Sequence, residues 1–297
     1  MTIQPLLRTK IIGGRMPIEF KPSSVHISLS GVVDKLSQIL EGRPLAICLQ
    51  GKSIQELEDR AIEFKDLPIC WGAMNRFDIY QDYILNKIEK KLQVTMDVAE
   101  VKFVEAYEKV IRVPRWKVYL ENKNNVLITS EEIIGNITDI YGYDFLSEYK
   151  DQLIVIEKCR KIRVPNSIML YLMVLAKLQV KKIILFGFDG FGNPKAFKDT
   201  PVWDAKEFTP EQYCNKTLSA YYKPETTLEE RVVGYQDERA SDLHSNCPTF
   251  NDQFRKTYGL FLKENNLQAS EIVNCGMDSL YTVFRKISYD QLQGELN

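Results

Sequence analysis

The two histidines of the chain are its first candidates for proton transfer, because an unperturbed imidazole titrates near neutral pH. His244 lies in the polar stretch SDLHSN, and we interpret it as a candidate general base that removes a proton from a hydroxyl group. The structural alternative for His244 is a cap of the following helix or a surface position. His26 lies in the strand-like stretch SVHISLS, and we assign it a structural role.

A second candidate is the turn Gly51-Lys52-Ser53, which follows an apolar run. A P-loop requires a glycine five residues before Gly51, where this chain has Ala46, so we do not expect a P-loop. A helix that starts at this turn still presents free backbone N–H groups to an anion. Alternatively, Gly51 only permits a sharp turn, and Ser53 caps the helix in an S-x-x-E box with Glu56.

Polar and glycine residues stand at comparable places elsewhere, after expected strands or before expected helices. In an open α/β sheet, ligands bind beyond the carboxyl ends of the strands. Each of these residues also has a structural alternative, because Asn and Ser are common helix caps and glycine relieves crowding. Together they predict a nucleotide-type site, to which we assign Gly51, Ser53, Asn75, Asn166, Ser167, Gly187, Asp189 and Gly190.

The segments that position these residues alternate between apolar runs and amphipathic stretches. Runs typical of buried parallel strands occur at 44–50, 68–73, 152–157, 183–188 and 271–276, the last being the expected final strand. Helices are expected at 53–64, 78–92, 168–178 and 249–264. This order predicts an α/β fold with a doubly wound, mostly parallel sheet.

The middle of the chain has a weaker pattern. We interpret WKVYLE at 116–121 and NVLITS at 125–130 as two strands joined by the polar turn at 122–124. Thr129 and Glu132 are then expected to cap a short helix.

Residues 191–242 are polar and aperiodic, and long aperiodic segments inside compact domains are often functional lids. Tyr221 and Tyr222 are placed to offer hydroxyl groups to a phosphate from such a lid, although tyrosines of this kind more often pack. We therefore divide the chain into an N-terminal extension (1–40), a nucleotide-binding core (41–190), a lid or acceptor segment (191–242) and a C-terminal completion of the core (243–297).

The composition is that of an ordinary globular protein, with 297 residues, 44% hydrophobic, 27% charged and a net charge of −1. This charge balance argues against nucleic acid as a partner. Six scattered cysteines and two histidines predict buried thiols and no metal site. We find no signal peptide and no apolar stretch that spans a membrane, so the expected location is the cytoplasm. Peripheral membrane association and the oligomeric state are left open.

Four segments together resemble the bacterial sialyltransferase-like superfamily: LAICLQGKSIQEL, CWGAMNRF, VPNSIMLYLMVLAKLQVKKIILFGFDGFG and IVNCGMDSLYTVFRKI. The superfamily includes single-domain bacterial sialyltransferases, motility accessory factors and archaeal 6-hydroxymethylpterin pyrophosphokinases. The resemblance implies a Rossmann-like fold with an inserted lid. It also implies that Gly51, Ser53, Asn75, Asn166, Ser167 and Gly187 hold a CMP-sugar and that His244 is the catalytic histidine.

The function that the resemblance implies is transfer of a sugar from a nucleotide-activated donor, such as a CMP-nonulosonate, to a glycan or glycoconjugate, without a required metal. One alternative is a Mg²⁺-dependent pyrophosphokinase, in which Asp189 and Asp242 hold the metal against ATP phosphates. Another alternative is a non-catalytic Rossmann-like binding subunit.

Overall fold

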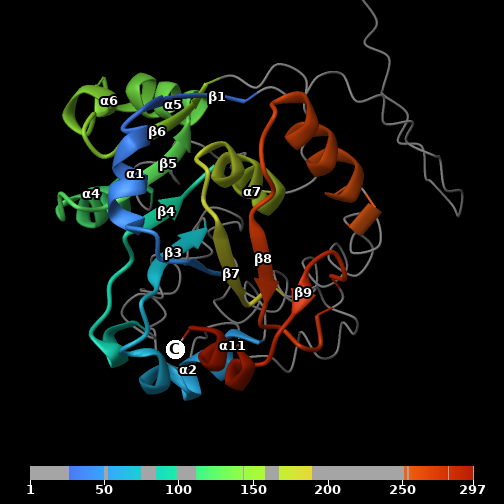
Figure 1. The fold of residues 1–297 in the computed structure, drawn as a ribbon. Helices are drawn as coiled ribbons and strands as arrows, with labels where there is room; N and C mark the ends of the chain where they lie inside the picture. Colours follow the sequence, from blue (N-terminus) through green and yellow to red (C-terminus); the bar gives the residue numbers. More distant parts are fainter. Residues whose placement is uncertain are drawn as a thin grey trace, which may run out of the picture.

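The computed structural model describes residues 27–49, 53–74, 85–98, 112–142, 144–157, 167–188, 251–252, 254–279 and 281–296. Over these residues the chain is an α/β protein built on a nine-stranded, mostly parallel sheet (Figure 1). The strand order is β1-β6-β5-β4-β3-β2-β7-β8-β9, and β1 is antiparallel to β6. The strands are β1 (Ser28–Gly31), β2 (Leu45–Cys48), β3 (Cys70–Met74), β4 (Val94–Met96), β5 (Val126–Ser130), β6 (Leu153–Glu157), β7 (Lys182–Phe186), β8 (Glu271–Asn274) and β9 (Arg285–Lys286).

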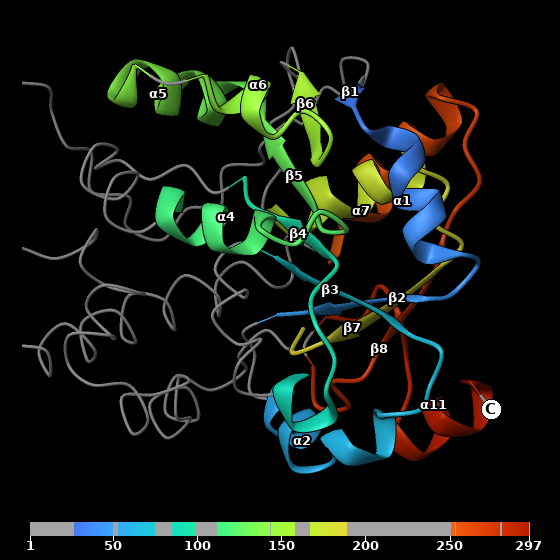
Figure 2. The ribbon, with the colours of Figure 1, turned by 90° about the vertical axis from the view of Figure 1, so that its left-hand side faces the viewer.

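Helices pack on both faces of this sheet, and Figure 2 shows α4 and α1 on opposite sides of it. The α4-side core holds apolar residues from α2 (Ile54–Asp59), η1 (Ala61–Phe64), η3 (Leu85–Ile88), α4 (Val113–Leu120), α5 (Glu131–Tyr141), α6 (Phe145–Glu148) and α11 (Tyr289–Leu296). The α1-side core holds those from α1 (Val33–Leu40), α7 (Ser167–Lys177) and the helix at 254–264. No helix in the described ranges combines the length and hydropathy of a membrane span.

Strand β2 shows why the apolar runs become central strands. All four of its residues are buried, and they alternate between the two cores: Ala46 and Cys48 face the α4-side core, and Leu45 and Ile47 face the α1-side core. A strand that is buried on both faces needs an apolar side chain at every position. Each fully buried aliphatic side chain contributes about 1.5–3 kcal/mol, so the central strands hold the two layers together.

The strand order reverses between β2 and β7. From β2 the chain adds β3, β4, β5 and β6 on one side, then returns to place β7 on the other side of β2 and continues to β8. Both neighbours of β2 are parallel to it, so the carboxyl ends of β2 and β7 lie at the same edge of the sheet. Such a reversal point is where open α/β sheets bind their ligands.

Most expected elements are confirmed, including the buried strands at 44–50, 68–73, 125–130, 152–157 and 183–188. The helix expected at 168–178 is confirmed as α7. The strand expected at 116–121 is wrong, because these residues belong to helix α4. Trp116, Tyr119 and Leu120 are buried at helical spacing, whereas Val118 is 67% exposed. The alternation of Trp116, Val118 and Leu120 imitates a strand, but burial follows the helical period.

Other differences lie where signals are short. The described part of the helix expected at 78–92 is only the 3₁₀ turn η3, and Glu89 follows it in a left-handed conformation (φ +55°). The three-residue strand β4 then follows, and the sequence pattern does not predict it. Helix α5 is capped by the side chain of Ser130, which accepts from the Ile133 N–H, and not by Thr129. Strand β8 is not the last, because the two-residue strand β9 pairs with it.

Candidate functional site

The structure describes three of the residues assigned to the nucleotide-type site: Ser53, Ser167 and Gly187. Ser53 follows β2 and Gly187 follows β7, and these two strands are neighbours with Cys48 opposite Phe186. Ser53 and Gly187 are therefore brought to the same edge of the sheet, as expected. The remaining assigned residues lie outside the described ranges, as does the segment 191–242: Gly51, Asn75, Asn166, Asp189, Gly190, Tyr221, Tyr222 and His244.

Ser167 begins helix α7 on the α1 side of the sheet. Its helix follows β6, which is four strand positions from β2, and runs back to the amino end of β7. Helix α7 therefore begins, at Ser167, on the carboxyl side of the sheet and lies over the α1-side face. The structure does not bring Ser167 to the ends of β2 and β7 through any described contact.

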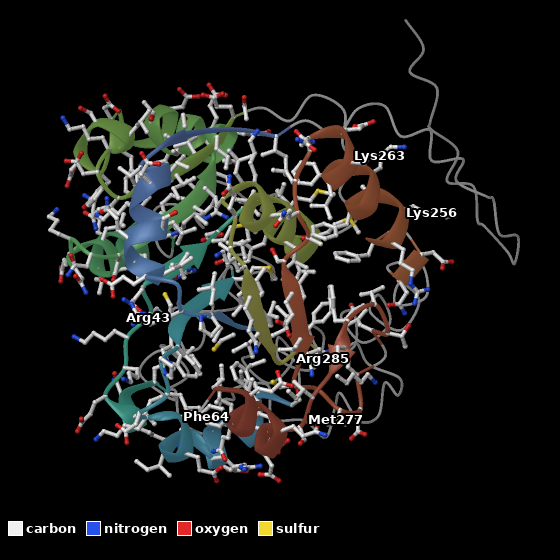
Figure 3. All side chains as sticks on the ribbon, viewed as in Figure 1. Arg43, Phe64, Lys256, Lys263, Met277 and Arg285 are labelled. Carbon is white, nitrogen blue, oxygen red and sulfur yellow. The ribbon has the colours of Figure 1, made fainter. Side chains whose placement is uncertain are left out.

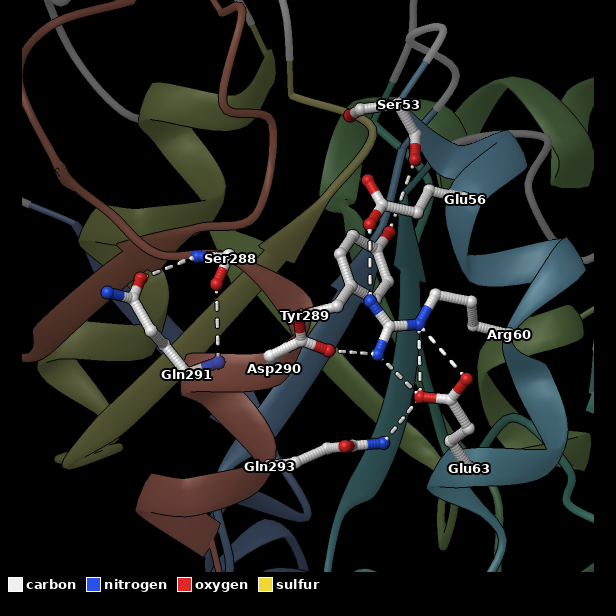
Figure 4. A network of polar contacts seen from close by, with 9 residues as sticks. All are labelled: Ser53, Glu56, Arg60, Glu63, Ser288, Tyr289, Asp290, Gln291 and Gln293. Atoms are coloured by element: carbon white, nitrogen blue, oxygen red, sulfur yellow. Dashed lines mark hydrogen bonds and ion pairs between the residues drawn. The ribbon is translucent and has the colours of Figure 1, made fainter.

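Ser53 is held through its backbone, and the capping box expected for its side chain is wrong. Ser53 has helical torsions (φ −62°, ψ −12°), and its side chain does not cap α2. Its carbonyl accepts instead from the Glu56 N–H at 3.2 Å and from the Tyr289 hydroxyl at 3.2 Å (Figure 4). A side chain cannot act as an N-cap when its residue is already helical. Helix α11 thus holds the start of α2.

Helix α11 is fastened to α2 and η1 by a polar network on the surface (Figure 4). Arg60 pairs with Glu56, Glu63 and Asp290, and Gln293 donates to Glu63 Oε2 at 2.8 Å. Hydrogen bonding from Arg60 lowers the pKa of Glu63. Beneath this network, the Tyr289 ring lies 5.6 Å from both Phe64 and Phe186. The Arg60 guanidinium lies 5.6 Å from the centre of the same ring, so Tyr289 lies between this cation and the aromatic rings of the core, of which Phe64 is labelled in Figure 3.

Gly187 lies in the turn after β7 and has a φ of +70°, a conformation that glycine adopts at little cost. The next carbonyl, that of Phe188, accepts two hydrogen bonds from buried side chains. Asn274 donates through Nδ2 at 2.9 Å, and Ser279 donates through Oγ at 2.7 Å. Asn274 also accepts from the Gly276 N–H at 3.0 Å. The loop after β8 therefore fixes the backbone of the turn after β7.

The same loop anchors the start of the helix at 254–264. The ring of Tyr281 stacks on Phe188 at a centroid distance of 4.1 Å, and Phe284 packs edge-on against Phe254 at 4.8 Å. The Asn251 side chain accepts from the Thr282 N–H at 3.0 Å. Lys256 and Lys263 are exposed on this helix (Figure 3). Described residues between 274 and 289 thus contact the start of α2, the backbone just after β7 and the helix at 254–264.

A charged cluster lies further along the carboxyl edge, after β4. The side chain of Asp97 is fully buried, and its Oδ2 atom lies 3.0 Å from Trp116 Nε1. Arg112 Nε and Arg115 Nη2 lie 3.4 and 3.5 Å from the same oxygen. Thr129 holds the Asp97 backbone by donating to its carbonyl at 2.8 Å. This cluster, which we call the Asp97 cluster, comprises Asp97, Arg112, Arg115 and Trp116.

The Asp97 cluster was not predicted from the sequence. Its members are brought together by β4, which the pattern does not reveal, and by α4, which was interpreted as a strand. One signal is present all the same: Arg112 and Arg115 stand at the start of α4, where the helix dipole disfavours cations. Two arginines at a helix N-terminus indicate an anionic partner nearby.

The described cysteines confirm the expectation of buried thiols. Cys48, Cys70 and Cys275 are buried and free. Burial raises the pKa of Cys70 to about 12 and also raises those of Cys48 and Cys275. These three thiols are therefore protonated at neutral pH and do not serve as nucleophiles. Within the described ranges, no three His, Cys, Asp or Glu side chains are grouped to hold a metal ion.

A groove of about 520 Å³ lies at the opposite, amino edge of the sheet. It is lined by residues of the α7–β7 turn, including Gln179 and Lys181, by the segment that leads into β8, including Asn266, and by Glu271 at the start of β8. Of the assigned residues that the structure describes, Ser53, Ser167 and Gly187, none lines this groove. The described residues at the carboxyl edge are therefore of two kinds: backbone held by side chains at β2 and β7, and buried charges at β4.

Comparisons of the chain with protein-family models, with curated proteins and with solved structures found no match to any of them.

Proposed function

We propose that this protein is a glycosyltransferase that binds a nucleotide-activated sugar, such as a CMP-nonulosonate, at the carboxyl ends of β2 and β7. The observation that supports the proposal is the strand order, which reverses between these two parallel strands. A sheet of this kind offers its ligand site outside the strand ends at the reversal point. The finer fold assignment, a Rossmann-like doubly wound sheet with a lid at 191–242, belongs to the same proposal.

The proposed site uses backbone groups more than charged side chains. Tyr289 holds the Ser53 carbonyl at the start of α2, and Asn274 and Ser279 hold the Phe188 carbonyl after β7, so both strand ends lead into backbone that is fixed by hydrogen bonds. In this proposal, backbone N–H groups next to these two positions bind the donor phosphate. Preorganised donors stabilise charge that develops on a leaving group, because they need no rearrangement during the reaction. The donor phosphate carries that charge when the bond to the sugar breaks.

The proposed general base is His244. It removes the proton from an acceptor hydroxyl as the hydroxyl oxygen bonds to the anomeric carbon of the sugar and the nucleotide leaves. The acceptor is a glycan or glycoconjugate. Asn75, Asn166, Asp189 and Gly190 contribute to donor binding in this proposal, and Tyr221 and Tyr222 contribute from the lid.

Nucleotide titration of the whole chain tests the proposal. The expected result is binding of CMP in preference to UDP and ATP, with or without Mg²⁺. Binding of ATP only in the presence of Mg²⁺ would replace the proposal with a pyrophosphokinase. Absence of binding to all three nucleotides would instead favour a non-catalytic subunit.

A histidine substitution tests the catalytic part. In His244→Ala we expect transfer to fall by about 100-fold or more while donor affinity is retained, which is the scale of general-base catalysis. His26→Ala is the matched control, because it removes the only other histidine of the chain. Near-normal transfer by His244→Ala would contradict this role.

A further inference from the structure

The groove of about 520 Å³ at the amino edge of the sheet lies between two turns that lead into neighbouring strands. One turn connects α7 to β7, and the other connects the helix at 254–264 to β8. The two chain segments meet where the Glu271 N–H donates to the Lys181 carbonyl at 2.7 Å. The volume of this groove is typical of small-ligand sites, which measure about 300–1,000 Å³.

The two turns have the same backbone conformation, because each helix ends in a Schellman motif. The Val180 N–H donates to the carbonyl five residues before it at 3.0 Å, and the Leu267 N–H does the same at 2.9 Å. The residue before each donor is left-handed: Gln179 has a φ of +57° and Asn266 a φ of +51°. Both of these residues line the groove.

The residue types at these two left-handed positions are unusual. Glycine is the common residue there, because a Cβ atom is crowded when φ is positive. Asn tolerates this conformation better than most residues, whereas Gln has no such advantage. Backbone strain is retained chiefly where a side chain has a role in function. Two amide side chains in place of glycine, on opposite walls of one groove, therefore indicate that the amides are used.

Three side-chain amides line the groove, Gln179 from one wall and Asn266 and Gln268 from the other. All three residues are exposed, and within the described part of the chain none of their side chains forms a hydrogen bond. An amide presents N–H donors next to an oxygen acceptor. This pair matches the edge of a nucleobase, and Asn and Gln bind adenine through paired hydrogen bonds to N6 and N7.

The rest of the lining suits a neutral ligand with a flat face. Two helix C-termini bring partial negative charge to the groove, and Lys181 offsets it with one positive charge. The Glu271 carboxylate already pairs with Arg285 Nη2 at 3.0 Å. A phosphate group therefore gains little from this lining. Small aliphatic side chains complete the lining and offer a surface for a planar ring: Ala176, Val180, Leu267 and Ala269.

We propose that this groove binds a nucleobase in the form of a neutral nucleoside, for which adenosine is the model ligand. Gln179 and Asn266 form hydrogen bonds with the edge of the base, and the aliphatic side chains contact its face. The site lies at the edge of the sheet opposite to the proposed nucleotide-sugar site. It does not depend on the proposed function.

Glycine substitutions test the role of the amides. Gln179→Gly and Asn266→Gly each remove an amide and place the favoured residue at the left-handed position. Each is expected to weaken adenosine binding about 10-fold or more, because a paired hydrogen bond to the base is lost. The melting temperature is expected to stay the same or to rise, so unfolding cannot account for the lost binding.

Glu41→Gly is the matched control. Glu41 is also left-handed, with a φ of +48° at the end of α1, and it does not line the groove. This variant makes the same backbone change as the other two and is expected to bind adenosine within twofold of the wild type. A 10-fold loss in Glu41→Gly would contradict the assignment of binding to the amides.

Calorimetric titration of the whole chain with adenosine, ribose and AMP measures what the groove recognises. Adenosine is expected to bind and ribose is not, because the base makes the contacts. AMP is expected to bind more weakly than adenosine, because the helix C-termini disfavour its phosphate. Tighter binding of AMP, or equal binding of ribose, would overturn the proposal of a neutral nucleobase ligand.

Hydrogen–deuterium exchange locates the bound nucleoside. Saturating adenosine should slow exchange in peptides that cover 178–181 and 266–271. Protection confined to 53–57 and 183–188 would place adenosine at the carboxyl edge and overturn the groove site, as would equal adenosine binding by the wild type and Gln179→Gly. A wild-type chain that binds CMP but not adenosine would reject this inference and retain the proposed function.

Discussion

Two regions of the carboxyl edge are built in opposite ways. At β2 and β7, neutral side chains of the C-terminal residues hold backbone turns: Tyr289 donates to Ser53, and Asn274 and Ser279 donate to Phe188. At β4, a buried carboxylate gathers two guanidinium groups and an indole around one oxygen. The region at β2 and β7 therefore presents oriented backbone dipoles, and the region at β4 presents oriented charges.

This difference has energetic consequences. Neutral hydrogen bonds to a backbone carbonyl each contribute about 1 kcal/mol net, so the β2/β7 end is built from small, independent contributions. A buried carboxylate and its cations depend on one another, because removing one partner leaves the others buried without compensation. Single substitutions at β2 and β7 are therefore expected to weaken ligand binding with little loss of stability. Substitutions in the Asp97 cluster are expected to lower the free energy of unfolding.

The largest effect is expected for Asp97→Asn. Removing this charge leaves Arg112 and Arg115 facing a neutral amide, and breaking a buried ion pair costs about 3–5 kcal/mol. The comparison variant is Asp290→Asn, whose side chain is 80% exposed and pairs with Arg60 on the surface. That change is expected to cost less than about 1 kcal/mol. Urea unfolding of both variants measures the difference, and equal losses would contradict the contrast between buried and surface charges.

A smaller effect is expected for Gly187→Ala. A Cβ atom at a φ of +70° is strained by about 1–2 kcal/mol. Gly142→Ala introduces similar strain at the end of α5, where φ is +59° and the space around the new Cβ is open. Thermal unfolding is expected to show similar losses for both variants, whereas only Gly187→Ala lowers CMP affinity. A loss of CMP affinity in Gly142→Ala would show that the binding change reflects stability alone.

A pair of hydroxyl deletions gives the next effect. Ser279→Ala and Thr129→Ala each remove a buried hydroxyl that donates to a carbonyl following a strand, at 2.7 and 2.8 Å. Each is expected to cost about 1 kcal/mol. Ser279→Ala is expected to weaken CMP binding several-fold, because the Phe188 carbonyl after β7 loses one of its two hydrogen bonds. Ser279→Thr keeps a hydroxyl group and is expected to retain part of the CMP affinity. Thr129→Ala leaves CMP binding unchanged, and calorimetric titration of the three variants measures these affinities.

The smallest effect on stability is expected for Glu295 in helix α11. Hydrogen bonds from Arg285 and Lys182 lower the pKa of Glu295 to about 2, below its ordinary value of 4.5. A carboxyl group with a lowered folded-state pKa stabilises the fold above its unfolded value and loses that contribution as pH falls from about 4.5 to 2. Because these charges are near the surface, we expect Glu295→Gln to change the melting temperature at pH 7 by less than about 2 °C. Melting temperatures between pH 2 and 7 should be less pH-dependent in Glu295→Gln, and an identical slope would contradict the pairing.

The central strands were predictable because burial on both faces requires uninterrupted apolar runs, as in Leu45–Cys48 and in residues 183–186 of β7. Strand β4 was not, because only Val94–Met96 pair with their neighbours, and three residues do not establish a period. Strand β9 has two charged residues, Arg285 and Lys286, and carries no apolar signal at all. Its existence depends on pairing with β8.

The candidate site was predictable only in part. Ser53 and Gly187 were placed at one edge by the rule that parallel strands share their carboxyl ends, and the strand order agrees. The residues that brace these turns were missed, because Asn274, Ser279 and Tyr289 act from the far end of the chain through contacts that no local pattern encodes. The Asp97 cluster was missed because three residues of β4 establish no pattern and because α4 was interpreted as a strand.

Hydrogen–deuterium exchange of the wild-type chain, with and without saturating CMP, tests the central claim most directly. Binding at the reversal point should slow amide exchange in peptides that cover residues 53–57 and 183–188, because these flank the turns after β2 and β7. Peptides that cover the amino-edge groove at 178–181 and 266–271 should be unchanged. Protection confined to that groove, or CMP binding without protection at either strand end, would contradict the account.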